Sequence, residues 1–111
     1  MGITKADLFT EAQNELAGIA KALAHPARIA IIEHLIKSNA CINNDLVEEL
    51  GLAQATISQH LRELKEIGII QGTIDGTRMC YCIEPVKWHM IKSLFNTLFN
   101  QIDEQGRPTC C

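Results

Sequence analysis

Apolar and polar residues follow two different periods along this chain, and together they predict five helices and one β-hairpin. Where apolar residues return every three or four positions, one face of a helix is buried. Where they return at every second position, the segment is a strand with one buried face. A mainly α fold with a two-stranded β element is therefore expected. The predicted helices are residues 5–23, 26–37, 45–50, 52–64 and 85–104, and the predicted strands are residues 69–74 and 78–83.

Two of the predicted helices are joined at Gly51, a residue type that ends one helix and permits a tight turn. Two helices joined in this way form a helix-turn-helix. The second helix turns Ile57, Leu61 and Leu64 inward, and its outward face carries hydroxyls, amides, an imidazole and one guanidinium. Such groups can hydrogen-bond to the edges of DNA bases. Direct base contacts are therefore expected from Gln54, Thr56, Ser58, Gln59, His60 and Arg62.

A β-hairpin follows the second of these helices. Asp75 and Gly76 lie between two β-rich runs, and Asp-Gly is a strong turn signal in hairpins. Helix, turn, helix and hairpin in this order predict a winged helix-turn-helix fold. At the tip of the wing, Thr77 and Arg78 are expected to contact the minor groove or its phosphates.

Three short segments within this predicted fold carry a more specific signature. Residues 24–29 read Ala-His-Pro-Ala-Arg-Ile, residues 54–61 read Gln-Ala-Thr-Ile-Ser-Gln-His-Leu, and residues 68–72 read Gly-Ile-Ile-Gln-Gly before a wing that ends in Tyr-Cys-Ile. Over roughly residues 10–100 the chain resembles the ArsR/SmtB family of metal- and metalloid-responsive bacterial repressors. The resemblance implies a repressor that binds double-stranded operator DNA as a two-fold dimer, paired through its first and last helices.

Length and composition agree with a small intracellular protein. The 111 residues are expected to form one domain over residues 1–104, followed by a flexible cysteine-containing tail at residues 105–111. No apolar run reaches membrane-spanning length and no secretory signal is evident, which predicts a cytoplasmic location without a membrane partner. Five cysteines, an odd number, favour reduced thiols. With a net charge of -3, affinity for DNA must come from the placement of basic side chains, and its salt dependence is expected to be shallow.

The last predicted helix carries a wide, aromatic-rich apolar stripe for so small a domain. The first helix of the same chain can cover only part of this stripe. A second copy covers the remainder most economically, although the stripe could also be simply the domain's own core. The expected dimer interface consists of Leu8, Phe9, Ala12, Trp88, Ile91, Leu94, Phe95, Leu98 and Phe99.

The metal-ligand positions of the resembled family are only partly filled in this chain. Zinc-responsive members carry Asp-x-His at the start of the last helix and His with His or Glu near its end. Here Pro85 and Lys87 stand at the starting positions, and residues 100–104 contain no His. Arsenic-responsive members carry Cys-x-Cys-Asp-Leu before the recognition helix, where this chain keeps Cys41 but has Asn43. Neither of the usual sites is complete.

A different pair of cysteines lies on the second wing strand. Cys80 and Cys82 should project from the face opposite Met79, Tyr81 and Ile83. Their Cβ atoms would lie about 7 Å apart, too far for a disulfide, whereas a soft ion could bridge them. Thiolates without imidazole favour arsenite, antimonite or copper(I) over zinc. The predicted inducer is arsenite or antimonite, bound by Cys80 and Cys82 with Cys110 or Cys111 from the tail, and with Cys41 as a lesser candidate.

Two alternatives to this prediction remain open. Thiol oxidation or persulfide sensing would use the same cysteines, and a winged helix can also serve protein contacts without binding DNA. An enzyme is not expected, because the chain has no glycine-rich phosphate loop and its four His residues lack a supporting catalytic motif. His25 is interpreted as a packing or capping residue before Pro26.

Overall fold

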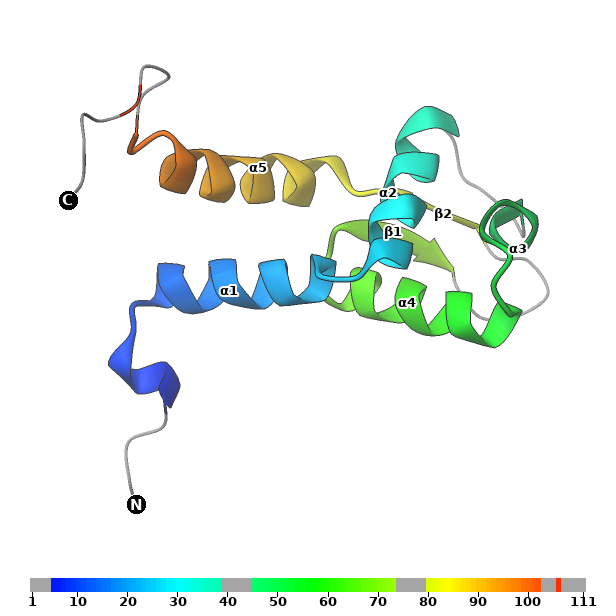
Figure 1. The fold of residues 1–111 in the computed structure, drawn as a ribbon, viewed down its shortest axis with the longest axis horizontal. Coiled ribbons are helices and arrows are strands. Elements are labelled where there is room, and N and C mark those ends of the chain that lie inside the picture. The colour runs from blue at the N-terminus through cyan, green and yellow to red at the C-terminus, as the bar shows by residue number, and fades with distance from the viewer. Residues whose placement is uncertain (1–4, 39–44, 74–79, 103–105, 107–111) are drawn as a thin grey trace.

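The structure is a computed structural model that describes residues 5–38, 45–73, 80–102 and 106. The predicted fold class, mainly α with one antiparallel β-hairpin, is confirmed. Helices α1 and α5 lie side by side and extend away from the part formed by α2, α3, α4 and the hairpin (Figure 1). The elements are η1 (Lys5–Leu8), α1 (Glu11–Leu23), α2 (Pro26–Ser38), α3 (Asp45–Leu50), α4 (Gln54–Glu66), β1 (Ile70–Thr73), β2 (Cys80–Ile83) and α5 (Pro85–Phe99).

The first long helix begins later than predicted. Thr10 caps it, because the Thr10 side-chain oxygen accepts a hydrogen bond from the backbone N–H of Gln13 at 3.0 Å and Gln13 Oε1 accepts one from the Thr10 N–H at 2.9 Å. This reciprocal capping box starts α1 at Glu11 and leaves η1 as a separate 3-10 turn. The prediction of one continuous helix over residues 5–23 is therefore wrong at its N-terminal end, and Leu8 and Phe9 lie outside α1.

Helix α2 begins at Pro26 as predicted, and the backbone N–H of Ala27 donates to His25 Nδ1 at 3.1 Å. His25 is thus confirmed as a capping residue. The helix buries Ile31, Ile32 and Leu35, whereas its other isoleucines, Ile29 and Ile36, are exposed. The buried and the exposed residues each fit a helical period, because this helix is apolar on two sides. Its contacts with α3, α4 and β2 select the face that is buried.

The helix-turn-helix is formed by α3 and α4. Gly51 follows α3 with φ +68°, a left-handed conformation that glycine adopts without steric strain. The predicted inward residues of α4, Ile57, Leu61 and Leu64, are fully buried. They pack in one core cluster with buried residues of α2, α3, the hairpin and α5. This core holds α4 from behind and leaves its opposite face free to carry polar groups.

The wing is a regular antiparallel pair except at Gly72, which lies opposite Tyr81. Gly72 has φ +126°, and a Cβ atom there would come within 2.0 Å of the carbonyl oxygen of Cys80. Only glycine permits this close approach of the two strands. The carbonyl oxygen of Gly72 also accepts a hydrogen bond from Lys65 Nζ at 2.6 Å, which joins the wing to the end of α4.

The last helix, α5, is shorter than predicted. It starts at Pro85, with the Glu84 side chain accepting from the backbone N–H of Lys87 at 2.6 Å. It ends at Phe99 rather than near residue 104, because the chain tightens into i→i+3 hydrogen bonds from Gln101 to Leu98 and from Ile102 to Phe99. No helix within the described ranges is long and apolar enough to cross a membrane.

Candidate nucleic-acid interface

The polar face of α4 points away from the core, as the sequence predicts. Two hydrogen bonds between side chains organise it: Gln54 Nε2 donates to Ser58 Oγ at 3.2 Å, and Gln59 Nε2 donates to Glu63 Oε1 at 3.1 Å. Amides and hydroxyls held in this way can exchange their partners for base edges. The exposed predicted residues of this face are Gln54, Thr56, Gln59 and Arg62, with Ser58 half-buried.

The N-terminus of α4 adds a second feature suited to DNA. Ala53 occupies the N-cap position in an extended conformation, and its methyl group cannot accept a hydrogen bond from the first turn. The backbone N–H groups at the start of a helix bind anions well, and DNA phosphates are common partners. Side chains suited to reading bases and a helix end suited to a phosphate therefore lie on the same element.

His60 does not belong to this polar face. It is 7% exposed, its Nδ1 atom accepts a hydrogen bond from Arg28 Nε at 3.0 Å, and its ring centroid lies 4.4 Å from that of His25. The prediction that His60 contacts DNA is therefore wrong. The physical reason is its register, because position 60 follows Ile57 by three residues and precedes Leu64 by four, which places it on the buried stripe of the helix.

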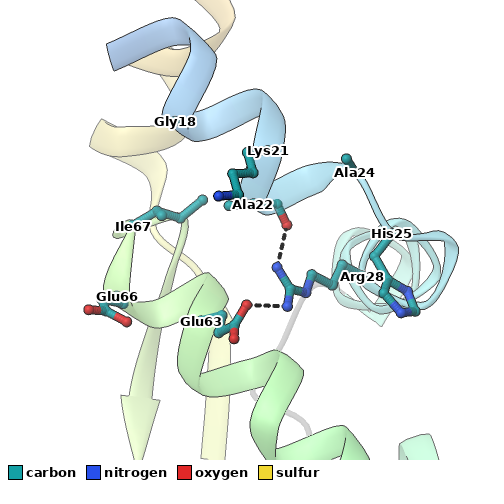
Figure 2. Close-up of a pocket in the computed structure, with 9 residues that line it drawn as sticks. All are labelled: Gly18, Lys21, Ala22, Ala24, His25, Arg28, Glu63, Glu66 and Ile67. Atoms are coloured by element: carbon teal, nitrogen blue, oxygen red, sulfur yellow. Dashed lines mark hydrogen bonds and ion pairs between the residues drawn. The ribbon is translucent and has the colours of Figure 1, made fainter. Parts of the chain in front are cut away.

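Arg28 connects three elements through its guanidinium group. From the first turn of α2, its Nη1 donates to the carbonyl oxygen of Ala22 at the end of α1 at 2.9 Å, and its Nε donates to His60 on α4. Its Nη2 forms an ion pair with the Glu63 carboxylate, also on α4 (Figure 2). In the sequence, Arg28 stands out only as part of the Ala-His-Pro-Ala-Arg-Ile signature. The missed signal is a cation in the first turn of a helix, where the helix dipole disfavours positive charge.

The electrostatics of this cluster favour a neutral imidazole beside a charged carboxylate. Burial lowers the pKa of His60 below its ordinary value, and the nearby His25 and Arg28 lower it further, although Glu63 acts in the opposite direction. The hydrogen bond from Gln59 and the charge of Arg28 lower the pKa of Glu63. His60 can therefore keep Nδ1 as the acceptor for Arg28 at neutral pH.

A cleft of about 500 Å³ lies beside the Arg28 cluster, between the end of α1 and the end of α4 (Figure 2). Small residues of α1 and the following turn form one wall, and acidic residues of α4 form the other. The two helices therefore do not pack side chain against side chain at this point. The lining residues are Gly18, Lys21, Ala22, Ala24, His25, Arg28, Glu63, Glu66 and Ile67.

Acidification is expected to destabilise the folded chain through His60. Because the pKa of His60 is lowered in the folded state from 6.5, the unfolded chain takes up a proton before the folded chain does. The contribution of the neutral imidazole to the free energy of unfolding is complete above about pH 6.5 and decreases below it, by at most about 1.4 kcal/mol per pH unit. Urea unfolding at about pH 7.5 and about pH 5.5 measures this change.

His60→Asn is the matched control for this prediction. The asparagine side chain keeps an oxygen that can accept from Arg28 but does not titrate in this range. The variant should therefore lose less stability on acidification than the wild type, because every other ionisable residue is the same in both proteins. Equal losses in the two proteins would show that His60 is not the responsible group.

The two wing cysteines lie where the sequence predicts. Cys80 is exposed and Cys82 is half-buried, on the face of β2 opposite the buried Tyr81. Gln71, the register partner of Cys82, donates Nε2 to its sulfur at 3.8 Å. Among the residues that the structure describes, no three His, Cys, Asp or Glu side chains lie close enough to hold a metal ion. The pair therefore needs a further donor to form a three-thiolate site.

Several predicted site residues lie outside the described ranges. These are the wing-tip residues Thr77 and Arg78, the remaining cysteines Cys41, Cys110 and Cys111, and, apart from Gly106, the tail at residues 105–111. Their roles stay predictions. Lys65, whose side chain joins α4 to the wing through a hydrogen bond to Gly72, was not identified from the sequence. A lysine near the end of a helix gives no sign of such a contact in the sequence.

The predicted dimer face is exposed at its outer end and covered near the core. Leu8, Phe9, Leu98 and Phe99 are 67%, 57%, 46% and 64% exposed. Ala12 is also exposed, and Trp88, Leu94 and Phe95 are half-buried. A hollow of about 410 Å³ on α5 is lined in part by Trp88, Phe95 and Phe99. Ile91 is only 6% exposed, so its assignment to the dimer interface is corrected to the core of the single chain.

The chain is similar to known proteins in both sequence and fold. Residues 25–71 match the family described as "Bacterial regulatory protein, arsR family". The HTH-type transcriptional regulator YgaV of Escherichia coli (strain K12) is 30% identical over 86 residues, which cover 78% of this chain and 84% of YgaV. The uncharacterized HTH-type transcriptional regulator Rv0081 of Mycobacterium tuberculosis is 38% identical over 63 residues, 57% of this chain. This match spans about half the length of Rv0081, 55%.

Solved structures show the same fold. The crystal structure of Rv0081 superposes with a TM-score of 0.61 at 28% identity, covering 84% of this chain and 94% of that one. The homodimeric winged helix-turn-helix DNA-binding domain Mb0332 (fragment 1–100) from Mycobacterium bovis superposes with a TM-score of 0.60 at 20% identity, covering 99% of both chains. The winged helix-turn-helix prediction is confirmed. The matched family and the named relatives are transcription regulators rather than enzymes, which agrees with the prediction of a non-enzymatic protein.

Proposed function

Because this chain belongs to the arsR family of bacterial regulatory proteins, we propose that it is a repressor that binds operator DNA as a cytoplasmic homodimer. Arsenite or antimonite, bound by cysteine thiolates, releases it from the operator. The observation that carries the proposal is the outward face of α4, where Gln54, Thr56, Gln59 and Arg62 are exposed above a buried apolar stripe. Such a face is suited to the major groove.

Docking on DNA follows from the position of α4 at the surface. Its uncapped first turn binds a phosphate and fixes the register, while its polar side chains read base edges. In a dimer with two-fold symmetry, two copies of α4 enter successive major grooves on one side of the duplex, about 34 Å apart. The wing then lies beside the adjacent minor groove, with Thr77 and Arg78 as the proposed contacts.

The dimer is formed through η1, α1 and the outer part of α5. Exposed Leu8, Phe9, Leu98 and Phe99 would be removed from water by a second copy, and exposed apolar patches of this kind commonly mark protein contacts. Mb0332, which shares the fold, is described as homodimeric, and this supports the same assembly here. Two copies also supply the two reading helices that a palindromic operator requires.

The proposed inducer site is built on the wing. Cys80 and Cys82 present two sulfur atoms on one face, and soft thiolates favour trivalent arsenic or antimony. A third thiolate would come from Cys110 or Cys111, with Cys41 as the lesser candidate. The hydrogen bond between Lys65 and Gly72 gives the wing a direct connection to α4. An ion that changes the angle of the wing would therefore favour a form in which wing and helix no longer fit the DNA together.

Replacing both wing cysteines, Cys80→Ser and Cys82→Ser, is expected to leave operator binding intact and to abolish release by arsenite. Serine oxygens are poor ligands for trivalent arsenic, while neither thiol lies on the DNA-reading face of α4. A mobility-shift titration with DNA from upstream of the protein's own gene, under thiol-reducing conditions, measures binding and release in one experiment. Ultraviolet thiolate charge-transfer bands should appear with arsenite in the wild type only.

Cys41→Ser is the matched single-thiol control and should release near wild-type arsenite concentrations. If the double variant is still released at those concentrations, the wing site is wrong. If a thiol oxidant or a persulfide releases the wild type and arsenite does not, the same cysteines serve redox sensing instead. If the wild type does not shift the upstream DNA at all, the chain is better explained as a protein-interaction module.

A further inference from the structure

The side chain of Arg28 makes its hydrogen bonds and its ion pair with elements other than its own helix. Its side chain is 13% exposed and it lies in the first turn of α2, where the helix dipole disfavours a cation. A helix gains nothing from positive charge at this end. The contacts that keep Arg28 in place are therefore those to other elements, namely the Ala22 carbonyl, the imidazole of His60 and the carboxylate of Glu63.

The chemistry of the three partners requires a guanidinium group. Its planar fork directs N–H groups to three separate acceptors at fixed angles, whereas a lysine ammonium is a point charge without this geometry. One acceptor lies at the C-terminal end of α1, where the carbonyl dipoles favour a cation. The other two, on His60 and Glu63, are one helical turn apart on α4 (Figure 2 shows the links to α1 and to Glu63).

The link through Arg28 lies beside the cleft between α1 and α4. Helices α1 and α4 contact each other and Ile19 of α1 is buried in the shared core, but the cleft of about 500 Å³ interrupts this packing between the end of α1 and the end of α4. Arg28 bridges the two helices beside the cleft. Helix α1 also packs against α5, next to the exposed apolar face described above. On α4, Glu63 accepts a hydrogen bond from Gln59, which belongs to the outward polar face.

We propose that Arg28 is a positioning residue that fixes the orientation of α4 relative to α1. In the dimer it thereby sets the separation of the two α4 helices and their fit to two half-sites. The statement about α1 and α4 concerns a single chain, whereas its consequence for DNA rests on the proposed function. Arg28 itself contacts no base in this view, because its donors already face Ala22, His60 and Glu63.

Arg28→Gln and Glu63→Gln test the proposal in the full-length protein. Lys37→Gln is the matched control, since it removes one exposed cation from the other end of the same helix. In weakly aligned samples, amide residual dipolar couplings of α1 and α4 should fit one common orientation with the geometry of the structure in the wild type and in Lys37→Gln. In Arg28→Gln the two helices should no longer fit together, although each should still fit separately.

The second measurement on the same variants is their affinity for operator DNA. Fluorescence anisotropy with the upstream DNA should show about a tenfold or larger loss for Arg28→Gln and a smaller loss for Glu63→Gln, with the dimer mass unchanged by sedimentation. The double variant should bind no more weakly than Arg28→Gln alone, because the two side chains act as one link. Lys37→Gln should bind like the wild type.

The proposal is overturned if Arg28→Gln keeps the wild-type orientation of α1 and α4, or if it binds the operator with wild-type affinity. Should Arg28→Gln fail to fold, Glu63→Gln decides by the same two measurements, since it keeps the size of the side chain and removes only its charge. A wild-type protein that does not bind DNA would contradict the proposed function. The dipolar couplings would still decide whether Arg28 fixes the two helices.

Discussion

The combined substitution Ser58→Ala, Gln59→Ala and Arg62→Ala is expected to remove specific operator binding while the protein stays folded. Gln59 and Arg62 are exposed and Ser58 is half-buried, and the buried stripe of α4 is left untouched. Each base-reading side chain is worth about 1 to 3 kcal/mol of discrimination. The three losses together should reduce specific affinity by about 100-fold or more, and should reduce affinity for unrelated DNA much less.

A comparison with Arg78→Ala makes this prediction specific. Arg78 is predicted to contact phosphates, so its loss should weaken all DNA sequences alike and lower the salt dependence slightly. Lys37→Ala, which changes an exposed cation on α2, should leave both kinds of binding unchanged. The measurement is anisotropy with the operator and with a scrambled fragment at several salt concentrations. Unchanged operator affinity in the triple variant would refute the assignment of the α4 face.

Leu98→Glu combined with Phe99→Glu is expected to convert the dimer into monomers. The two side chains are 46% and 64% exposed in the single chain, so acidic groups there cost the monomer little. In a dimer they would bring carboxylates into an apolar contact, where burial of a charge is strongly unfavourable. Sedimentation at micromolar concentration should therefore give the monomer mass.

Operator binding should fall with the loss of the dimer, by about 100-fold or more, because two linked half-site contacts become two independent ones. Ile36→Glu is the control, since Ile36 is 50% exposed on α2 and outside the proposed interface. It should leave both mass and operator affinity close to the wild type. A wild-type chain that already sediments as a monomer, or a variant that stays dimeric, would remove η1, α1 and α5 from the interface.

Much of the fold could be predicted from local patterns in the sequence. The inward stripe of α4 and Gly51 are short-range signals, and each predicts a feature that the surrounding packing reinforces. The Asp75-Gly76 signal lies outside the described residues, but the two strands that it predicts are paired. The late start of α1 was also readable, because Thr10 and Gln13 have the spacing of a capping box. The buried face of α2 could not be predicted in this way. Its apolar residues satisfy two registers, and only contacts with other elements distinguish them.

In the candidate site, too, some features follow from local sequence patterns and others depend on tertiary contacts. The exposed residues of α4 follow from helical periodicity. His60 lies on the buried stripe by the same periodicity, and it was assigned to the outward face because its side chain is polar. The partner of its buried Nδ1 atom, Arg28, is 32 residues away in the sequence. The pairing of Arg28 with Glu63, separated by 35 residues, depends equally on the tertiary fold. Periodicity describes one element at a time and cannot show such links.

Gly72 has a further consequence for how the protein behaves at high concentration. Within the described residues the sheet has only two strands, so each strand has an edge that another chain could extend. Both strands are four residues long, and the left-handed φ of Gly72 interrupts the regular geometry of β1. A short and kinked edge is a poor template for an added strand. The glycine that brings the two strands of the wing together thus also protects the wing against edge-to-edge aggregation.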